Sequence, residues 1–251
     1  MSLESQLAEL VAVNSKLVDY FNNKKAGIDT AVAAAIAAVP ETIRNWYVDQ
    51  VNGSDANAGT LIAPFRTIGK AIASTPNFGL CNVRLLSDYV INESISVTCS
   101  NVFVVGEGAI RTLSPKYFQT PNADGVTYST ALGSFLLTNP ATNIEFRNVN
   151  VALPSSSGVN PAPVFNRLTG FIRTNSTGNV PPFLGVALAA VQITMAVDFV
   201  GALIGSTVSA ISLSAISTTF PSGFAGKYVM GVAAGAAPKD TPNVLSNLST
   251  L

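Results

Sequence analysis

The side chains best suited to acid–base chemistry in this 251-residue chain are carboxylates, because the chain has no histidine. That absence excludes Ser-His and Cys-His nucleophilic sites and His-ligated zinc. Enzymes that hydrolyse polysaccharides use two carboxyl groups, one as an acid and one as a base or nucleophile. Glu107 and Glu145 could share one face, but solvated surface charges are the simpler interpretation. We therefore predict no catalytic residue among the acids that follow the N-terminal helical pattern, which are Asp49, Asp55, Asp88, Glu93, Glu107, Asp124, Glu145, Asp198 and Asp240.

Metal binding is not predicted either. An Asp-x-Asn-x-Gly run that starts at Asp55 has the oxygen ligands of a calcium loop, but the twelfth position, where an EF-hand needs glutamate, is Arg66. The same residue types form tight turns, so we predict a turn. Cys81 and Cys99, the only cysteines, have apolar neighbours and are predicted to be buried thiols, since two sulfurs alone make no metal site. No cofactor is predicted.

Aromatic residues in a polar excursion at residues 114–132 are candidates for stacking on sugar rings. They could also anchor this excursion to the body of the protein. Two further loops are predicted at residues 155–163 and 175–182, from their serine, glycine, asparagine and proline content. The candidate glycan-contact residues are Tyr117, Phe118 and Tyr128.

Composition narrows the class of protein. The chain is 48% hydrophobic and 11% charged, with a formal net charge of zero. So low a charge argues against disorder and, with scattered Lys and Arg, against nucleic-acid binding. An apolar chain with few charges favours oligomerisation. No secretory signal is recognised, and the apolar residues 183–205 contain Gln192 and Asp198 without flanking cations, so buried strands are predicted there rather than a membrane span.

Residues 1–39 are predicted to form a helical coiled-coil stalk that ends at Pro40. Apolar residues recur there at alternating spacings of four and three, and Asn14 occupies one position of the seam, where a buried asparagine would set register and oligomer state. A helix that packs on its own body is the alternative. The predicted coiled-coil core is Leu3, Leu7, Leu10, Asn14, Leu17, Phe21 and Ile28.

The pattern of the residues that follow the predicted stalk indicates short strands and turns. The run that starts at Asn82 resembles the run at Asn101, 19 residues later, and a third run starts at Asn143, a further 42 residues on. Such spacing predicts coils of a parallel β-helix in which equivalent residues stack about 4.8 Å apart. We assign the β-helix body to residues 40–182. Residues 183–251 either continue it or form a separate trimeric β-domain.

Residues 47–72 join the two parts. A strand, a polar turn and a short helix are predicted, and the apolar face of that helix would cover the end of the β-helix. The face consists of Phe65, Ile68, Ala71 and Ile72. The segment reads Tyr-Val-Asp, Asn-Gly-Ser-Asp-x-Asn-x-Gly-Thr, then Pro-Phe-x-Thr-Ile-x-x-Ala-Ile. It resembles the first segment of right-handed parallel β-helix proteins of the pectate-lyase-like type, including bacteriophage tailspikes and tail fibres.

The resemblance implies a mainly β, trimeric virion protein of the phage tail, made in the host cytoplasm. We expect an adhesive function without catalysis, in which the N-terminal region contacts other tail or baseplate proteins and the body contacts a host surface polysaccharide. A polysaccharide depolymerase on the same scaffold, a hydrolase or a lyase, is one alternative. An internal tail or baseplate connector is another. Neither nucleic-acid binding nor membrane insertion is expected.

Overall fold

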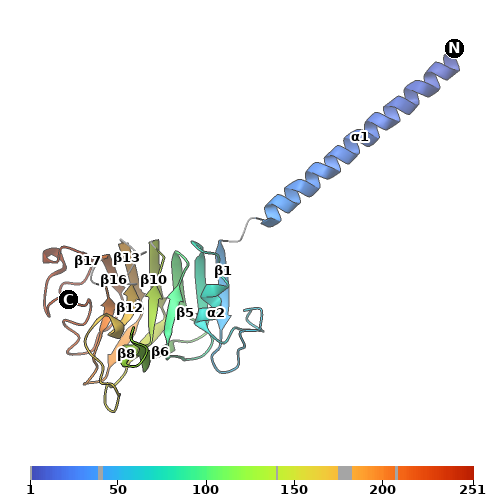
Figure 1. Cartoon of the computed structure of the whole chain (residues 1–251). Coiled ribbons are helices and arrows are strands. Elements are labelled where there is room, and N and C mark those ends of the chain that lie inside the picture. Colours follow the sequence, from blue (N-terminus) through green and yellow to red (C-terminus); the bar gives the residue numbers. More distant parts are fainter. Residues whose placement is uncertain (1, 39–41, 140, 175–182, 207–208) are drawn as a thin grey trace. The chain divides into compact units, whose positions relative to one another are not determined.

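The structure, a computed structural model, describes residues 2–38, 42–139, 141–174, 183–206 and 209–251. The chain divides into two compact units, Met1–Glu41 and Thr42–Leu251, and each is described by itself. The protein is mainly β, with parallel sheets and one long N-terminal helix, which confirms this part of the expected fold (Figure 1). Pro40, the predicted helix stop, and the predicted loop at residues 175–182 lie outside the described residues.

The first unit contains helix α1, Leu3–Ala38, whose 36 residues extend about 54 Å at 1.5 Å per residue. Strong helix formers dominate the segment, and no proline interrupts it. Gly27 leaves open space where a side chain would stand. The predicted seam residues all lie on this helix, and each is exposed in the single chain.

The second unit is built on a seven-stranded sheet in which every neighbouring pair of strands is parallel. In order across the sheet, its strands are β1 (Ile43–Val48), β2 (Leu80–Leu85), β5 (Asn101–Gly106), β10 (Ala141–Arg147), β13 (Phe183–Ala189), β16 (Ala210–Ile216) and β17 (Val244–Ser246).

Two four-stranded parallel sheets complete the body. The strands of the second sheet are, in order across it, β14 (Gln192–Met195), β11 (Val149–Leu153), β6 (Arg111–Pro115) and β3 (Tyr89–Ile91). The third runs β15 (Ala202–Gly205), β12 (Gly170–Thr174), β9 (Ser134–Leu137), β4 (Ser94–Val97). Outside them lie an antiparallel hairpin, β7 (Tyr117–Pro121) with β8 (Tyr128–Leu132), helix α2 (Ile68–Ala73) and two short 3-10 helices, η1 (Arg167–Thr169) and η2 (Pro238–Asp240).

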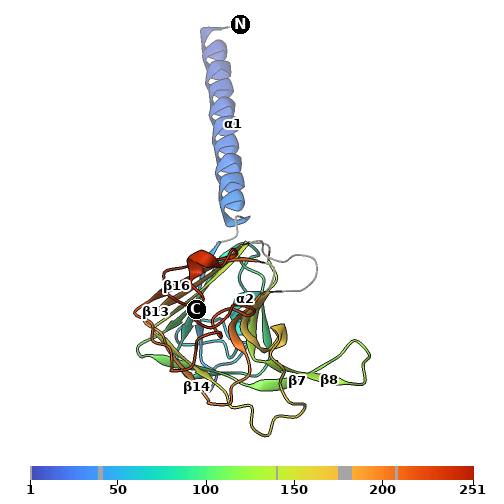
Figure 2. The ribbon, with the colours of Figure 1, turned by 90° about the vertical axis from the view of Figure 1, so that its left-hand side faces the viewer.

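From β2 onward the chain visits the three sheets in rotation. Strands β2, β3 and β4 belong to the seven-stranded, second and third sheets in turn, and β5, β6 and β9 repeat this order one strand further along each sheet. The cycle recurs with β10, β11, β12 and with β13, β14, β15. Hairpin β7–β8 interrupts one cycle and projects from the stacked sheets (Figure 2). Residues 183–251 thus extend sheets that begin in the preceding part of the chain.

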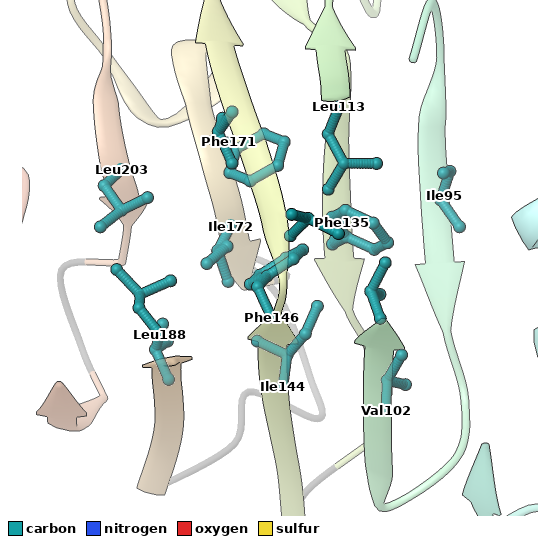
Figure 3. Close-up of a cluster of buried hydrophobic side chains, with 14 of the residues drawn as sticks. Ile95, Val102, Leu113, Phe135, Ile144, Phe146, Phe171, Ile172, Leu188 and Leu203 are labelled. Atoms are coloured by element: carbon teal, nitrogen blue, oxygen red, sulfur yellow. The ribbon is translucent and has the colours of Figure 1, made fainter. Parts of the chain in front are cut away.

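The core lies between the three sheets. Along each strand one side chain points inward and the next outward, which buries every second residue in β2 and β10. Phe135 on β9, Phe146 on β10 and Phe171 on β12 form an aromatic cluster with ring centroids 5.4–5.7 Å apart (Figure 3). All three are fully buried. One cluster therefore links the seven-stranded sheet to the third sheet.

The predicted repeat is right over one interval and wrong over the other. Asn101 lies opposite Asn143, which confirms the 42-residue spacing. Asn101 lies opposite Leu80, however, so the first interval is 21 residues and not 19. A shift of two residues keeps every side chain on the same face of the sheet, so hydrophobic alternation does not distinguish the two registers.

Residues 47–72 form a strand, a turn and a short helix, but the helix is shorter than predicted. It begins at Ile68 because Thr67 caps it, with the Thr67 hydroxyl accepting a hydrogen bond from the Lys70 N–H at 3.0 Å. Phe65 precedes the helix and forms a parallel bridge with Val48. Phe65, Ile68, Ala71 and Ile72 are all buried nevertheless. Helix α2 packs on β1, β2 and β4.

Candidate functional site

A shallow groove crosses the outer face of the seven-stranded sheet. It consists of two hollows of about 300 and 290 Å³ that share Asn143, Gly185 and Ser212, and we call it the sheet groove. These three residues lie in register on neighbouring strands β10, β13 and β16. Gly185 and Ser212 are small, so the floor lies below the larger side chains around it. The other side chains that line it include Phe103, Glu145, Phe183, Ala187, Ser214, Asn243 and Leu245.

Gly185 determines how the floor is arranged. A Cβ at this position would lie 2.0 Å from Oδ1 of Asn143, so only glycine lets the asparagine side chain lie across β13. The Asn143 amide group donates a hydrogen bond to Oδ1 of Asn101 at 3.2 Å, which continues the row onto β5. No sequence pattern pointed to this groove as a site, although the confirmed spacing of Asn101 and Asn143 was a signal for the row of asparagines.

The groove carries both hydrogen-bonding and apolar side chains along its length. Asn101, Asn143 and Glu145 supply hydrogen-bonding groups, and Arg147 forms an ion pair with Glu145 on the same strand. The apolar residues Phe183 and Leu245 are 74% and 76% exposed. A chain that presents hydroxyl groups and an apolar ring face matches this combination, because hydroxyls bond to amides while the ring face covers an aromatic side chain.

The predicted glycan-contact residues lie on hairpin β7–β8, but they do not form one platform. Tyr117 and Phe118 are adjacent on β7, so their side chains point to opposite faces of the hairpin. Tyr128 pairs with Pro121 on the face that Tyr117 shares, four residues further along the hairpin, and is 52% exposed. With Pro161 and neighbouring residues, Tyr128 lines a hollow of about 120 Å³.

Tyr117 is an anchor of the hairpin. Its hydroxyl donates to the carbonyl of Val200 at 2.8 Å and accepts from the N–H of Val200 at 3.0 Å. Its ring stacks on Phe199, with centroids 6.5 Å apart. Burial raises the pKa of Tyr117 to about 12. These contacts tie the hairpin to a loop 83 residues later in the chain. Phe118 is also half-buried, so Tyr128 is the most exposed of the three aromatic residues.

We predict that Tyr117→Phe lowers the free energy of unfolding by about 1–3 kcal/mol, because it leaves both backbone groups of Val200 without their partner. The matched substitution Tyr128→Phe removes an exposed hydroxyl and should change stability by less than about 0.5 kcal/mol. Urea unfolding followed by circular dichroism measures both. Equal stability of the two variants would contradict the anchoring role of Tyr117.

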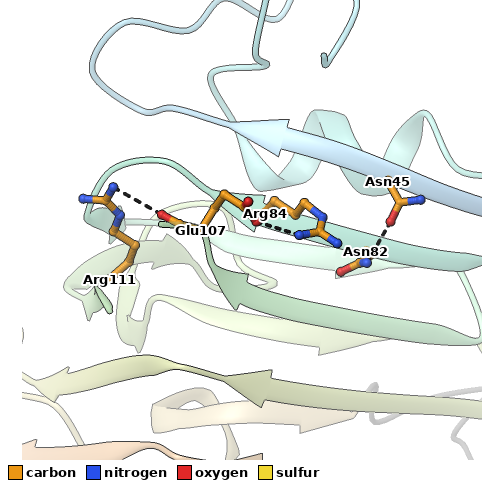
Figure 4. Close-up of polar contacts among 5 residues, drawn as sticks. All are labelled: Asn45, Asn82, Arg84, Glu107 and Arg111. Carbon is orange, nitrogen blue, oxygen red and sulfur yellow. Dashed lines mark hydrogen bonds and ion pairs between the residues drawn. The ribbon is translucent and has the colours of Figure 1, made fainter. Parts of the chain in front are cut away.

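Several carboxylates have structural partners. Glu107 accepts from Arg84 Nη1 at 2.6 Å, and its backbone carbonyl accepts from Arg111 (Figure 4). Glu145 is paired with Arg147. Glu107 and Glu145, the acids that could share a face, are thus each paired with a separate arginine. On the neighbouring β1 and β2, Asn82 donates to Asn45 at 2.8 Å (Figure 4).

Other acids organise loops. Asp198 accepts from the Ser155 hydroxyl at 2.8 Å, and this bond holds the pKa of Asp198 below its usual value. Asp55, the first residue of the calcium-like run, accepts hydrogen bonds from the N–H groups of Arg66 and Thr67 at 3.0 and 2.9 Å. These bonds fasten the turn to the start of α2, as expected for a structural aspartate.

Cys81 and Cys99 are free and buried, as the sequence predicted, and their thiols contact each other. Within the described residues, no three His, Cys, Asp or Glu side chains gather as a potential metal site. None of the helices that the structure describes has the length and hydrophobicity needed to cross a membrane.

Comparison with known proteins gives no relative: no family model matches the chain, and neither a curated protein nor a solved structure is detectably similar to it.

Proposed function

We propose that this protein is an adhesive, non-catalytic subunit of a bacteriophage tail fibre or tailspike, assembled as a homotrimer in the phage tail. In this proposal the body is a right-handed parallel β-helix, in which each coil contributes one strand to each of three sheets. The rotation of successive strands through the sheets supports the β-helix, and so does the parallel register of every pair in the seven-stranded sheet.

The observation that carries the proposal is the exposed apolar seam of α1. Its six apolar members, Leu3 to Ile28, are each at least 50% exposed in the single chain. Apolar side chains spaced by three and four residues along a 36-residue helix need a partner surface, and further copies of the same helix supply one. Asn14 then lies in the seam and sets its register. The trimer, rather than another oligomer, comes from the resemblance of residues 47–72.

The sheet groove is the surface proposed to contact the host polysaccharide. Its asparagine and serine side chains match sugar hydroxyls, and Phe183 offers an exposed ring. Tyr128 on hairpin β7–β8 is a second contact. The proposed partners of the N-terminal region are other tail or baseplate proteins.

The mass of the particle in solution tests the assembly. Sedimentation equilibrium is expected to give about three times the chain mass of 26.0 kDa. The purified protein should also reduce phage adsorption to host cells, because it occupies the same receptor. A 26.0 kDa particle would refute the trimer, and unchanged adsorption would favour an internal connector.

Enzymatic cleavage is tested separately. Incubation with capsular polysaccharide or lipopolysaccharide should produce no new reducing ends and no unsaturated products. Sustained cleavage that is lost in Glu107→Gln or Glu145→Gln would overturn the non-catalytic proposal in favour of a depolymerase.

A further inference from the structure

A buried arginine in the third sheet has no acidic partner among the residues that the structure describes. Arg173 on β12 is 6% exposed, and among the described residues no carboxylate forms an ion pair with it. Burying a cation without a counter-charge is unfavourable, and burial together with the nearby Arg167 lowers the pKa of Arg173 to about 10. The two cations therefore disfavour each other's charge, and no described carboxylate forms an ion pair with either of them.

Hydrogen-bond donors are in excess around Arg173. Its Nε donates to the Ser134 hydroxyl at 2.9 Å, and its Nη2 donates to the Ser94 hydroxyl. Each serine oxygen acts as an acceptor in these bonds, so its own proton remains available. Arg167 donates through Nη1 to the carbonyl of Thr174 at 2.7 Å. In the described part of the chain, the other guanidinium protons of Arg173 and Arg167 and the two serine protons meet no acceptor.

Gly205 on β15 packs closely beside the two arginines. A Cβ at Gly205 on β15 would lie 3.1 Å from the backbone oxygen of Arg167 and 3.5 Å from Cβ of Arg173. It would also lie 3.0 Å from Cα of Gly170 on the neighbouring β12, so a side chain here would crowd both strands. The glycine therefore allows β15 and β12 to approach closely beside Arg173.

We propose that Arg173 and Arg167, with the hydroxyls of Ser94 and Ser134, bind a small oxyanion: a carboxylate, sulfate or phosphate group. An oxyanion only accepts hydrogen bonds, which matches a site with surplus donors. Guanidinium groups bind such oxygens in a planar, bidentate manner. The site lies on the third sheet and the adjoining η1, and shares no residue with the sheet groove. It does not depend on trimer formation or adhesion.

The alternative is that Arg173 only ties strands β12, β9 and β4 together through the two serines. In that case the site would have no preference for added oxyanions. The two explanations differ in how the protein responds to oxyanions, which can be measured on the intact chain.

The experiment is thermal unfolding of the full chain in sodium sulfate, sodium phosphate or sodium acetate, each compared with sodium chloride at equal ionic strength. A ligand that binds only the folded state raises the midpoint in proportion to the logarithm of its concentration. Sulfate also stabilises proteins by exclusion from their surface, so the difference between variants is the readout. Calorimetric titration of the same anions gives the affinity directly.

Arg167→Gln is the main variant, because Arg167 is only partly buried and its loss should leave the fold intact. We expect it to weaken oxyanion binding about tenfold or more, the equivalent of one charge-assisted hydrogen bond. Arg173→Gln should abolish binding if it folds. Arg66→Gln removes the same charge from an exposed side chain and should keep the response of the unmodified protein.

Sodium glucuronate and glucose, added in separate titrations, identify the source of the anion. Tighter binding of glucuronate than of acetate, with no response to glucose, would indicate an acidic sugar; equal binding would indicate a free anion. Both results support the site. An identical midpoint shift in the unmodified protein and in Arg167→Gln, with no heat of binding in either, would overturn it.

Discussion

Replacement of Phe146 with alanine is expected to lower the free energy of unfolding by about 3–5 kcal/mol. Phe146 is completely buried on β10, and its ring lies 5.4 Å from that of Phe135 and 5.6 Å from that of Phe171, measured between centroids (Figure 3). The substitution removes apolar contacts and leaves a cavity between two sheets. Strands from successive passages of the chain meet there, so they cannot close the cavity without losing their register.

The matched control is Phe183→Ala on β13, a neighbouring strand of the same sheet. Phe183 is 74% exposed, so its replacement should change stability by less than about 0.5 kcal/mol. Urea unfolding of both variants, followed by intrinsic fluorescence and circular dichroism, gives the comparison. If Phe146→Ala were no less stable than Phe183→Ala, the aromatic cluster would not be the centre of the core.

The second large effect concerns assembly. The double substitution Leu10→Glu and Leu17→Glu is expected to convert the proposed trimer into 26.0 kDa monomers. Both leucines lie in the proposed seam of α1, where each glutamate would bring like charges together in an apolar interface. Because the second unit has its own core, its circular dichroism should stay unchanged while the mass falls to one third.

Ala12→Glu with Ser15→Glu is the control for this experiment. It adds the same charge to α1 at exposed positions outside the seam, and it should leave the mass in sedimentation equilibrium unchanged. A trimer that survives the leucine substitutions would place the dominant contacts in the second unit. Monomers in both double variants would mean that charge on α1, and not the seam, controls assembly.

Much of the local structure could be predicted from the sequence. The spacing of apolar residues from Leu3 to Ile28 identified the long helix, because a helix repeats about every 3.6 residues whatever its surroundings. Alternation identified strands such as β2 and β10, and the four apolar residues of residues 47–72 were correctly placed in the core. The candidate site could be predicted less well from the sequence, because Tyr117, Phe118 and Tyr128 were grouped only by their nearness in sequence.

The sequence by itself determined the long helix, and the strands of clearest alternation such as β2 and β10 with their buried faces, because these depend on repeats of a few residues. It did not show that residues 117–132, expected as a loop, form the hairpin β7–β8. Tertiary structure alone decided the pairing of Leu80 with Asn101, since a two-residue slip buries the same face. It also decided the roles of three residues through distant neighbours: Tyr117 meets Val200, Asn143 lies across Gly185, and Arg173 reaches Ser94, 79 residues earlier. Such contacts arise only when successive passages of the chain stack, and no local pattern encodes them.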